Sequence, residues 1–516
     1  MNRYRPILLI ALLVALAPIW ITQREMWDGV TVEYAFETGD MSGLLHAVMA
    51  SGWPAAKWVY KTLSVLQESM SIPYWLGIDM LYTMALTGMA YEVYLLARQR
   101  LGWSSPRTDL LLILFLMQPI WHILMSAVHI AHMLGFWFLL LGHRLTCSKP
   151  LWTKLCGLLL VTISFQYPAS IVMIFWLELM FYFSAREERH ESVGRAIAVA
   201  CYAVAWYVAS RTIFGPTETF GGYNQLLFPT SVEAVRQIIW TGFKFCSWIL
   251  VLTLPLWFGA MWRSRLVPFR AIKWAHIGWC RRHPHWVLAL IGCFLAIAPY
   301  WAVGKGPVVL MPYDWTARNA LPLALPLSML IALGMQKFAD AAGENGRQRR
   351  EQLMMLSLFL WWFGMSLVGV AGKLYQIKLE RAIESSLRSL PAPPSGFVTL
   401  QLEFDPLVRI RQLEANGLLW RAYGRAEWAV LIGPPQTWVK QIRETYVGDQ
   451  AAAVTRVKSP ELWKKFYVMG DLKNFDCETV IGLSVSSTQS LKPVWLNWLG
   501  WSPLQLTARQ EKSSCQ

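Results

Sequence analysis

The first stretch of the chain that could carry chemistry is acidic and follows directly on the first apolar run. The stretch runs from Glu25 to Asp40, and its candidate carboxylates are Asp28, Glu33, Glu37 and Asp40. If residues 30–37 are helical, Glu33 and Glu37 lie one turn apart on the same face. Such carboxylates can take a proton from a hydroxyl as a general base, or bind a divalent metal. Asp28 is the favoured catalytic candidate and Glu33 the second. The alternative is a set of solvated acids.

A second group of charged residues precedes a later apolar run. Arg318 stands at the start of that run, and Asp314 and Lys305 come before it. A guanidinium in this position is a suitable partner for a phosphate group, since it donates several hydrogen bonds in a fixed geometry. These three residues are candidates for substrate binding. The alternative for Arg318 is an interfacial arginine that contacts lipid phosphate.

Two further candidates lie next to apolar runs. His129 and His132 are spaced i, i+3, which would suit a metal, but no carboxylate lies close in the sequence. Hydrogen bonding between membrane helices is the alternative for such polar residues. Arg211 lies at the end of another apolar run. His129 and Arg211 therefore complete the candidate substrate-binding residues, and the sequence leaves a metal or other cofactor undetermined.

The composition is that of a membrane protein. Of 516 residues, 55% are hydrophobic and only 15% are charged, whereas a soluble domain carries about 25% charged residues. The formal net charge is +15, but lysine and arginine are spread over short loops between apolar runs. That distribution is typical of orientation signals and not of a nucleic-acid-binding domain. We therefore expect membrane lipids, and no nucleic acid, as partners.

The apolar runs predict an all-α polytopic membrane protein with about eleven transmembrane helices, because each run approaches the ~20 residues that cross a bilayer. The runs are residues 6–21, 72–96, 108–127, 128–143, 152–167, 169–185, 193–213, 242–262, 285–303, 318–336 and 352–372. If the N-terminus is cytoplasmic, the loops on that side carry most of the lysine and arginine, as the positive-inside rule requires. The predicted location is the inner (plasma) membrane.

The organisation around these runs predicts two domains, residues 1–375 within the membrane and residues 376–516 as a small extracytoplasmic α/β domain. Three outside loops, residues 23–71, 214–241 and 304–317, are longer than a turn requires. The first contains two amphipathic segments expected at the membrane interface. After the last apolar run we expect a helix over residues 375–388 and strands over residues 397–404 and 427–433. In the C-terminal domain, Cys477 and Cys515 could form a disulfide.

The layout resembles the integral-membrane glycosyltransferases of the C class (GT-C fold), including bacterial enzymes of surface polysaccharide and O-antigen modification. The resemblance lies in one span followed by an acidic outside loop with interfacial helices, about ten further spans, a late arginine-bearing outside loop and an outside C-terminal domain. It implies transfer of a sugar from a polyprenyl-phosphate donor to a cell-envelope glycan on the outer face of the membrane. The implied partners are a lipid-linked sugar donor and a glycan acceptor.

In this resemblance, Asp28 is the acid after the first span, Glu33 a second candidate, and Arg318 the phosphate-binding arginine. Many enzymes of the class have two acids adjacent or one residue apart, whereas Asp28 stands alone between Trp27 and Gly29. A metal-free general base is therefore the simpler expectation. Two other interpretations remain. One is an envelope polysaccharide polymerase or ligase that uses outside arginines and a histidine. The other is a non-enzymatic transporter or scaffold that uses charged mid-span residues such as Asp79 or Glu178.

Overall fold

The structure is a computed structural model of the 516-residue chain. It describes residues 5–21, 29–50, 54–121, 126–165, 167–184, 189–214, 227–264, 284–307, 315–340, 344–393, 396–403, 412–424, 428–432, 479–487 and 506–514.

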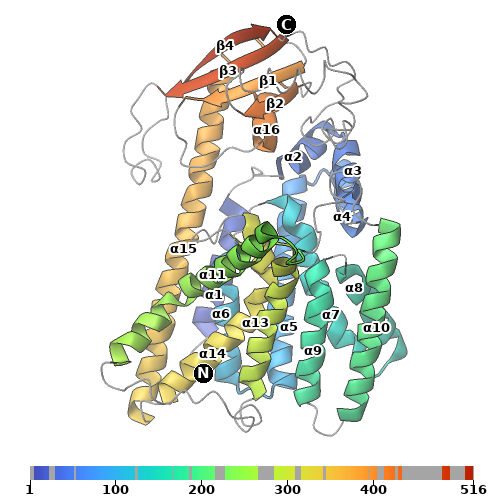
Figure 1. Ribbon diagram of the computed structural model, residues 1–516, viewed down its shortest axis with the longest axis vertical. Helices are drawn as coiled ribbons and strands as arrows, with labels where there is room; N and C mark the ends of the chain where they lie inside the picture. The colour runs from blue at the N-terminus through green and yellow to red at the C-terminus, as the bar shows by residue number, and fades with distance from the viewer. Residues whose placement is uncertain are drawn as a thin grey trace.

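The described chain is mostly helical and forms a bundle with a small sheet at one end (Figure 1). The bundle helices are α1 (Arg5–Ile21), α5 (Tyr74–Leu95), α6 (Ser105–Leu116), α7 (Ile130–Thr146), α8 (Leu151–Ser164), α9 (Pro168–Ser184), α10 (Arg189–Phe214), α11 (Val232–Ser264), α13 (Pro284–Ala302), α14 (Ala324–Asp340) and α15 (Glu344–Leu387). Short helical turns join some of them: η1 (Leu96–Arg100), η3 (Ala127–His129) and η5 (Trp315–Leu323).

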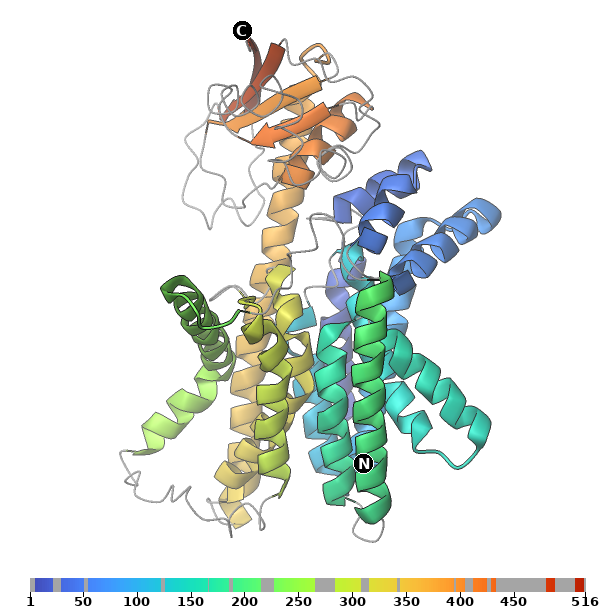
Figure 2. The same cartoon turned by 45° about the vertical axis from the view of Figure 1, so that its right-hand side comes forward.

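Three short helices lie at the end of the bundle that faces the sheet (Figure 2). They are α2 (Gly29–Thr38), α3 (Ser42–Ala50) and α4 (Pro54–Met70). Residues 30–37 are helical and belong to α2, so the condition for Glu33 and Glu37 to lie one turn apart is met. The two amphipathic segments expected in the first loop are α3 and α4. On α4, Trp58 and Val65 are exposed whereas Tyr60 and Leu63 are buried, so the helix has one packed face and one outward face.

Four helical segments of the described chain are long and apolar enough to cross a membrane: Val232–Trp257, Pro284–Ala302, Arg318–Lys337 and Arg349–Leu387. Shorter apolar helices occupy Pro6–Ala17, Leu151–Ser164, Ala169–Met180 and Ala196–Ala209. Large apolar side chains such as Leu13, Leu159 and Phe294 are exposed on the outer faces of these helices. In a soluble protein so much exposed apolar surface would be unusual, whereas lipid would cover it here. The structure is consistent with a membrane protein.

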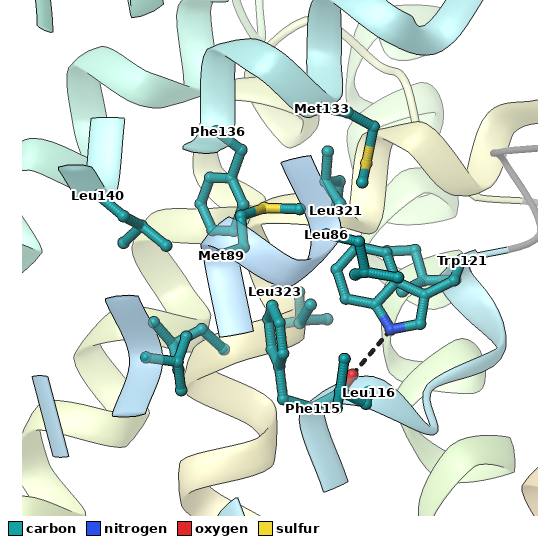
Figure 3. Close-up of a cluster of buried hydrophobic side chains, with 14 of the residues drawn as sticks. Leu86, Met89, Phe115, Leu116, Trp121, Met133, Phe136, Leu140, Leu321 and Leu323 are labelled. Carbon is teal, nitrogen blue, oxygen red and sulfur yellow. Dashed lines mark hydrogen bonds between the residues drawn. The ribbon is translucent and has the colours of Figure 1, made fainter. Parts of the chain in front are cut away.

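The centre of the bundle is filled by large apolar side chains from α5, α6, α7 and η5 (Figure 3). Trp121 is fully buried there, and its indole N–H donates to the carbonyl of Phe115 over 2.8 Å. This bond closes the turn that follows α6, which ends at Leu116. The apolar run 108–127 is therefore not one helix, because residues 117–121 leave the helix in a buried turn.

Helices α7 and α8 approach closely through two glycines. A Cβ added to Gly157 would lie 2.6 Å from the backbone nitrogen of Thr146 and 2.7 Å from the carbonyl oxygen of Gly142. A Cβ on Gly142 would in turn lie 2.8 Å from the carbonyl oxygen of Gly157. Membrane helices often pack through small residues in this way, since glycine lets two backbones touch.

Buried carboxylates near the other end of the bundle have partners on α7. Glu92 of α5 accepts two hydrogen bonds from the guanidinium of Arg144, at 2.6 and 2.9 Å. Glu178 of α9 lies 3.0 Å from Nε2 of His143. Acidic side chains among membrane helices need such partners. Neighbouring residues of α7 thus bind acids of two different helices, which gives Glu178 a structural role in helix packing.

The C-terminal sheet has the strand order β2-β1-β3-β4. Its strands are β1 (Gly396–Leu402), β2 (Trp428–Ile432), β3 (Thr479–Ser487) and β4 (Leu506–Ser514). β1 pairs in parallel with β2 and β3, and β4 pairs antiparallel with β3. The last helix, α16 (Gln412–Tyr423), packs with the end of α15 against this sheet. Both strands expected from the sequence are present as β1 and β2.

The end of α15 belongs to the C-terminal core. Tyr375, Leu379 and Ile383 are buried with strand residues such as Val398, in a cluster separate from that of the bundle. The helix expected over residues 375–388 is therefore the last part of α15, which runs unbroken from the predicted final span to Leu387. The division at residue 375 stays a prediction, as does the disulfide, whose cysteines lie outside the described residues.

Candidate functional site

The candidate site begins with Lys305, which a helix end holds in place. Gly304 adopts φ +68, a left-handed conformation that glycine accommodates without steric cost. The N–H of Lys305 donates to the carbonyl of Tyr300 over 2.8 Å, and the N–H of Gly304 donates to that of Trp301 over 3.1 Å. These two bonds form a Schellman motif, which ends α13 and fixes the backbone of Lys305.

Two tyrosines connect this helix end to Arg318. The hydroxyl of Tyr300 donates to the hydroxyl of Tyr167, which donates to the backbone carbonyl of Arg318 over 3.2 Å. Tyr167 lies in the turn before α9, and Arg318 lies in η5 and is partly buried. Because a single chain of hydrogen bonds runs from Tyr300 to Arg318, the backbones of Lys305 and Arg318 are held at the same site.

His129 belongs to the same region. It is fully buried at the end of η3. The hydroxyl of Tyr60 donates to the carbonyl of Ala127, which begins η3, and that of Tyr82 donates to the carbonyl of Ser126, just before it. Its ring lies 5.6 Å from that of His132, which lies 5.0 Å from that of Tyr167, measured between centroids. The charge of Arg318 acts on both histidines. Three predicted substrate-binding residues, Lys305, Arg318 and His129, thus lie together.

The site is electropositive, and this affects Lys305. Burial lowers the pKa of the Lys305 ammonium to about 7, and the neighbouring charge of Arg318 lowers it in the same direction. A bound anion would favour the charged form of the lysine and raise this pKa. Lys305 therefore changes its charge near neutral pH.

We expect the affinity for a polyprenyl phosphate to fall as the pH rises above about 7, because Lys305 loses its proton there. The sign follows from the lowered pKa: below it the lysine is charged and binds the anion, and above it the lysine is neutral. Equilibrium binding of a fluorescent polyprenyl phosphate between pH 6 and pH 9 would measure this. The variant Lys305→Arg keeps its charge over this range, so its affinity should not fall above pH 7. Below pH 7 both proteins should share the change caused by the second ionisation of the phosphate, whose pKa is about 6. An equal fall in both proteins would contradict the role of Lys305.

Helix α2 lies next to this site, because it packs against η3, which carries His129. Asp28, the favoured catalytic residue, lies outside the described residues. The next residue, Gly29, begins α2 and is buried. At the other end of α2, Gln67 of α4 donates to the carbonyl of Phe36 over 3.0 Å. The chain that follows Asp28 is thus held between the bundle and α4.

Glu33, the second catalytic candidate, takes part in an ion pair with the C-terminal region. Its carboxylate oxygens accept hydrogen bonds from Nε of Arg421, at 3.0 Å, and from Nη2 of the same guanidinium. Both side chains are 9% exposed, so the pair is almost entirely shielded from water. Burial lowers the pKa of Arg421, but the negative charges of Glu33, Glu380 and Glu384 raise this pKa by more, so the net shift is upward. Glu33 therefore has a structural role, and its catalytic role stays a prediction.

The remaining candidates are distributed differently. Glu37 is exposed on α2, and Asp40 accepts hydrogen bonds from the N–H and hydroxyl of Ser42, at 3.0 and 2.6 Å, where α3 begins. Arg211 lies near the end of α10, and Asp314 lies outside the described residues. In the described part of the chain, no group of three or more histidine, cysteine or carboxylate side chains is arranged to hold a metal ion.

Sequence reasoning did not identify Tyr300 or Arg421 as parts of these arrangements. Tyr300 lies within an apolar run, where aromatic residues are common. Arg421 pairs with a residue 388 positions earlier in the chain, and no local pattern signals such a distant contact. The lone basic residue in an otherwise apolar stretch of α16 was the only available signal.

Comparison with known proteins adds no relative: no family model matches the chain, and no curated protein matches it either.

Proposed function

We propose that the chain is a membrane glycosyltransferase that moves a sugar from a polyprenyl-phosphate donor to a cell-envelope glycan. Lys305 and Arg318 would bind the donor phosphate, and Asp28 would accept the proton of the attacking acceptor hydroxyl. The leaving polyprenyl phosphate would stay in the bilayer, with its head group at the site and its tail among the helices. No step of this mechanism requires a metal.

The observation that carries the proposal is the meeting of Lys305 and Arg318 beside α2. Two cations linked by a hydrogen-bonded pair of tyrosines suit a phosphate, because charge-assisted hydrogen bonds to phosphate are strong. Helix α2 packs against η3, which lies close to Arg318. The residue just before α2 is Asp28. A carboxylate near a bound sugar phosphate is the arrangement that general-base catalysis of glycosyl transfer requires.

The proposed topology has eleven spans, a cytoplasmic N-terminus and an extracytoplasmic C-terminal domain. Each of the eleven apolar runs contains one bundle helix, from α1 to α15, and this supports the count. The exposed apolar side chains on the outer faces of the helices and the cation-rich loops on one side support the membrane location and the orientation.

We expect Asp28→Asn to abolish transfer while leaving donor binding intact, since asparagine cannot act as a general base. General-base catalysis contributes about 100-fold to 10,000-fold to a rate, so the loss should lie in this range. The measurement is transfer of a labelled sugar from polyprenyl phosphate to an envelope glycan preparation, alongside equilibrium donor binding. The control is Glu37→Gln, which removes an exposed carboxylate of the same segment and should retain activity. Full activity of Asp28→Asn would exclude the assignment.

A polysaccharide polymerase or ligase is the second candidate, and the closeness of His129 to Arg318 favours it. Such an enzyme would use these two residues and Arg211 with a lipid-linked glycan as substrate. It predicts that Asp28→Asn stays active and that His129→Phe loses transfer. The proposed glycosyltransferase predicts loss in Asp28→Asn, so the same assay separates the two functions.

A further inference from the structure

We propose that the C-terminal domain positions the catalytic segment, with Arg421 as the positioning residue. The proposal rests on the proposed function, because it concerns the residue that precedes α2, Asp28. Arg421 lies in α16, whereas the cations that would bind the donor lie in η5 and after α13, and we assign Arg421 no contact with substrate. Its role is to hold α2 against α16 so that the start of α2 has one fixed place above the bundle.

The contact between α2 and α16 has a regular geometry. Arg421 binds both carboxylate oxygens of Glu33, and the ring of Trp420 meets that of Tyr34 edge to face, with centroids 5.2 Å apart. The next contact along the two helices is between Gly417 and Val30, where a Cβ on the glycine would lie 2.4 Å from Cγ1 of the valine.

The spacing of these contacts explains why the helices fit. On α2 they occur at residues 30, 33 and 34, and on α16 at residues 417, 420 and 421. Both series follow the i, i+3, i+4 pattern that places residues on one helix face. Gly417 fits this contact because a Cβ there would collide with the side chain of Val30.

Arg421 also joins α16 to α15. Its Nη1 donates to Glu380 over 3.2 Å and lies 3.9 Å from Glu384, and these two glutamates are one turn apart on α15. Gln376, a turn before Glu380, donates to that carboxylate over 2.9 Å and to Glu414 of α16 over 2.7 Å. The guanidinium thus connects three helices, and one of them, α15, is the final membrane helix.

This arrangement has a consequence for the reaction. The end of α2 nearest to Asp28 carries Val30 and Glu33, which are the residues that α16 contacts. Releasing them would let the start of α2 move, while Lys305 and Arg318 keep their own hydrogen-bonded support. A displacement of about 1 Å in a catalytic group can cost about 100-fold in rate. The C-terminal domain should therefore affect the rate of transfer and not the affinity for the donor.

The test compares Arg421→Gln with the wild-type protein in lipid nanodiscs. We expect kcat for sugar transfer to fall about 100-fold, with unchanged affinity for polyprenyl phosphate and faster hydrogen exchange in α2. Arg421→Lys keeps the charge but loses the bidentate contact with Glu33. Its kcat should therefore lie between that of the wild type and that of Arg421→Gln. The control is Arg381→Gln, which removes an exposed cation of α15 next to Glu380 and should leave kcat and exchange unchanged.

A second pair of variants tests the same contact without removing a charge. Gly417→Ala should lower kcat, because its Cβ collides with Val30. Adding Val30→Ala should restore part of the rate, since it removes the colliding methyl group and leaves the alanine at an ordinary distance. A merely destabilised α16 would not be rescued by a substitution in α2.

The outcomes separate this proposal from the proposed function. Wild-type kcat in Arg421→Gln, a parallel loss of donor affinity, or unchanged exchange in α2 would each overturn the positioning role. If the wild-type protein transfers no sugar, the proposed function fails, and hydrogen exchange alone then decides. If hydrogen exchange in α2 is faster in Arg421→Gln but not in Arg381→Gln, the result would still support the contact between α2 and α16. Equal exchange rates in the two variants would exclude it.

Discussion

Replacing Arg318 by alanine should weaken binding of a polyprenyl phosphate by about 10- to 100-fold and reduce sugar transfer at least as much. A hydrogen bond to a charged group contributes about 1.5–3 kcal/mol, which corresponds to this change in the dissociation constant. The fold should survive, because Tyr167 donates to the backbone carbonyl of Arg318 and not to its side chain. Equilibrium binding to the purified protein in nanodiscs would measure the effect.

Two further variants make this test specific for Arg318. Arg318→Lys keeps the positive charge but loses the planar fork, so its affinity should be intermediate. Arg236→Ala removes an arginine of α11 whose side chain is 79% exposed, and its affinity should match that of the wild type. If both alanine variants bind equally well, Arg318 has no special role and is an interfacial arginine.

Substituting Gly157 by alanine should lower the free energy of unfolding by about 1–3 kcal/mol, which is the usual cost of forcing extra atoms into a packed core. The new methyl group would collide with backbone atoms of α7, which cannot rotate away as a side chain can. Gly157→Leu should cost more and prevent α7 and α8 from packing. Unfolding by a graded increase of denaturing detergent, followed by tryptophan fluorescence, would measure the change.

In the matched control, the substitution of glycine by alanine should not lower the free energy of unfolding. Gly364 lies within α15, and a Cβ added there meets no atom within 4 Å. Glycine is about 0.5–1 kcal/mol less favourable than alanine in the middle of a helix, so Gly364→Ala should be neutral or slightly stabilising. Equal effects of the two substitutions would mean that helix propensity, and not close packing, determines the result at Gly157.

Much of the fold could be predicted from local patterns. Helices α3 and α4 follow from apolar spacing, and strands β1 and β2 follow from alternation. The sequence grouped Lys305 with Arg318 as candidates for substrate binding, but it named His129 as a separate candidate. Because His129 lies in a different turn of the chain, its place beside Lys305 and Arg318 depends on how the helices pack, which no local pattern records.

The remaining features depend on contacts between distant residues. The apolar sequence continues past the end of α6 and therefore does not show where the helix stops. The buried indole of Trp121 stabilises the turn that ends it. Strands β3 and β4 follow a long stretch without clear periodicity, so they were not predicted. Glu33 and Arg421 are 388 residues apart in the chain. The local sequence around either residue gives no sign of the other.

Helix α15 is one continuous helix that is much longer than a bilayer is thick. Its 44 residues extend for about 66 Å at ~1.5 Å per residue, whereas the hydrocarbon layer is ~30 Å thick. About half of this rod can therefore project beyond the bilayer, and a tilt of about 10° would swing its far end by roughly 11 Å. Arg421 joins the far end of α15 to α16 and α2. A change in the tilt of α15, such as one caused by a different lipid thickness, would therefore move the sheet and α2 together.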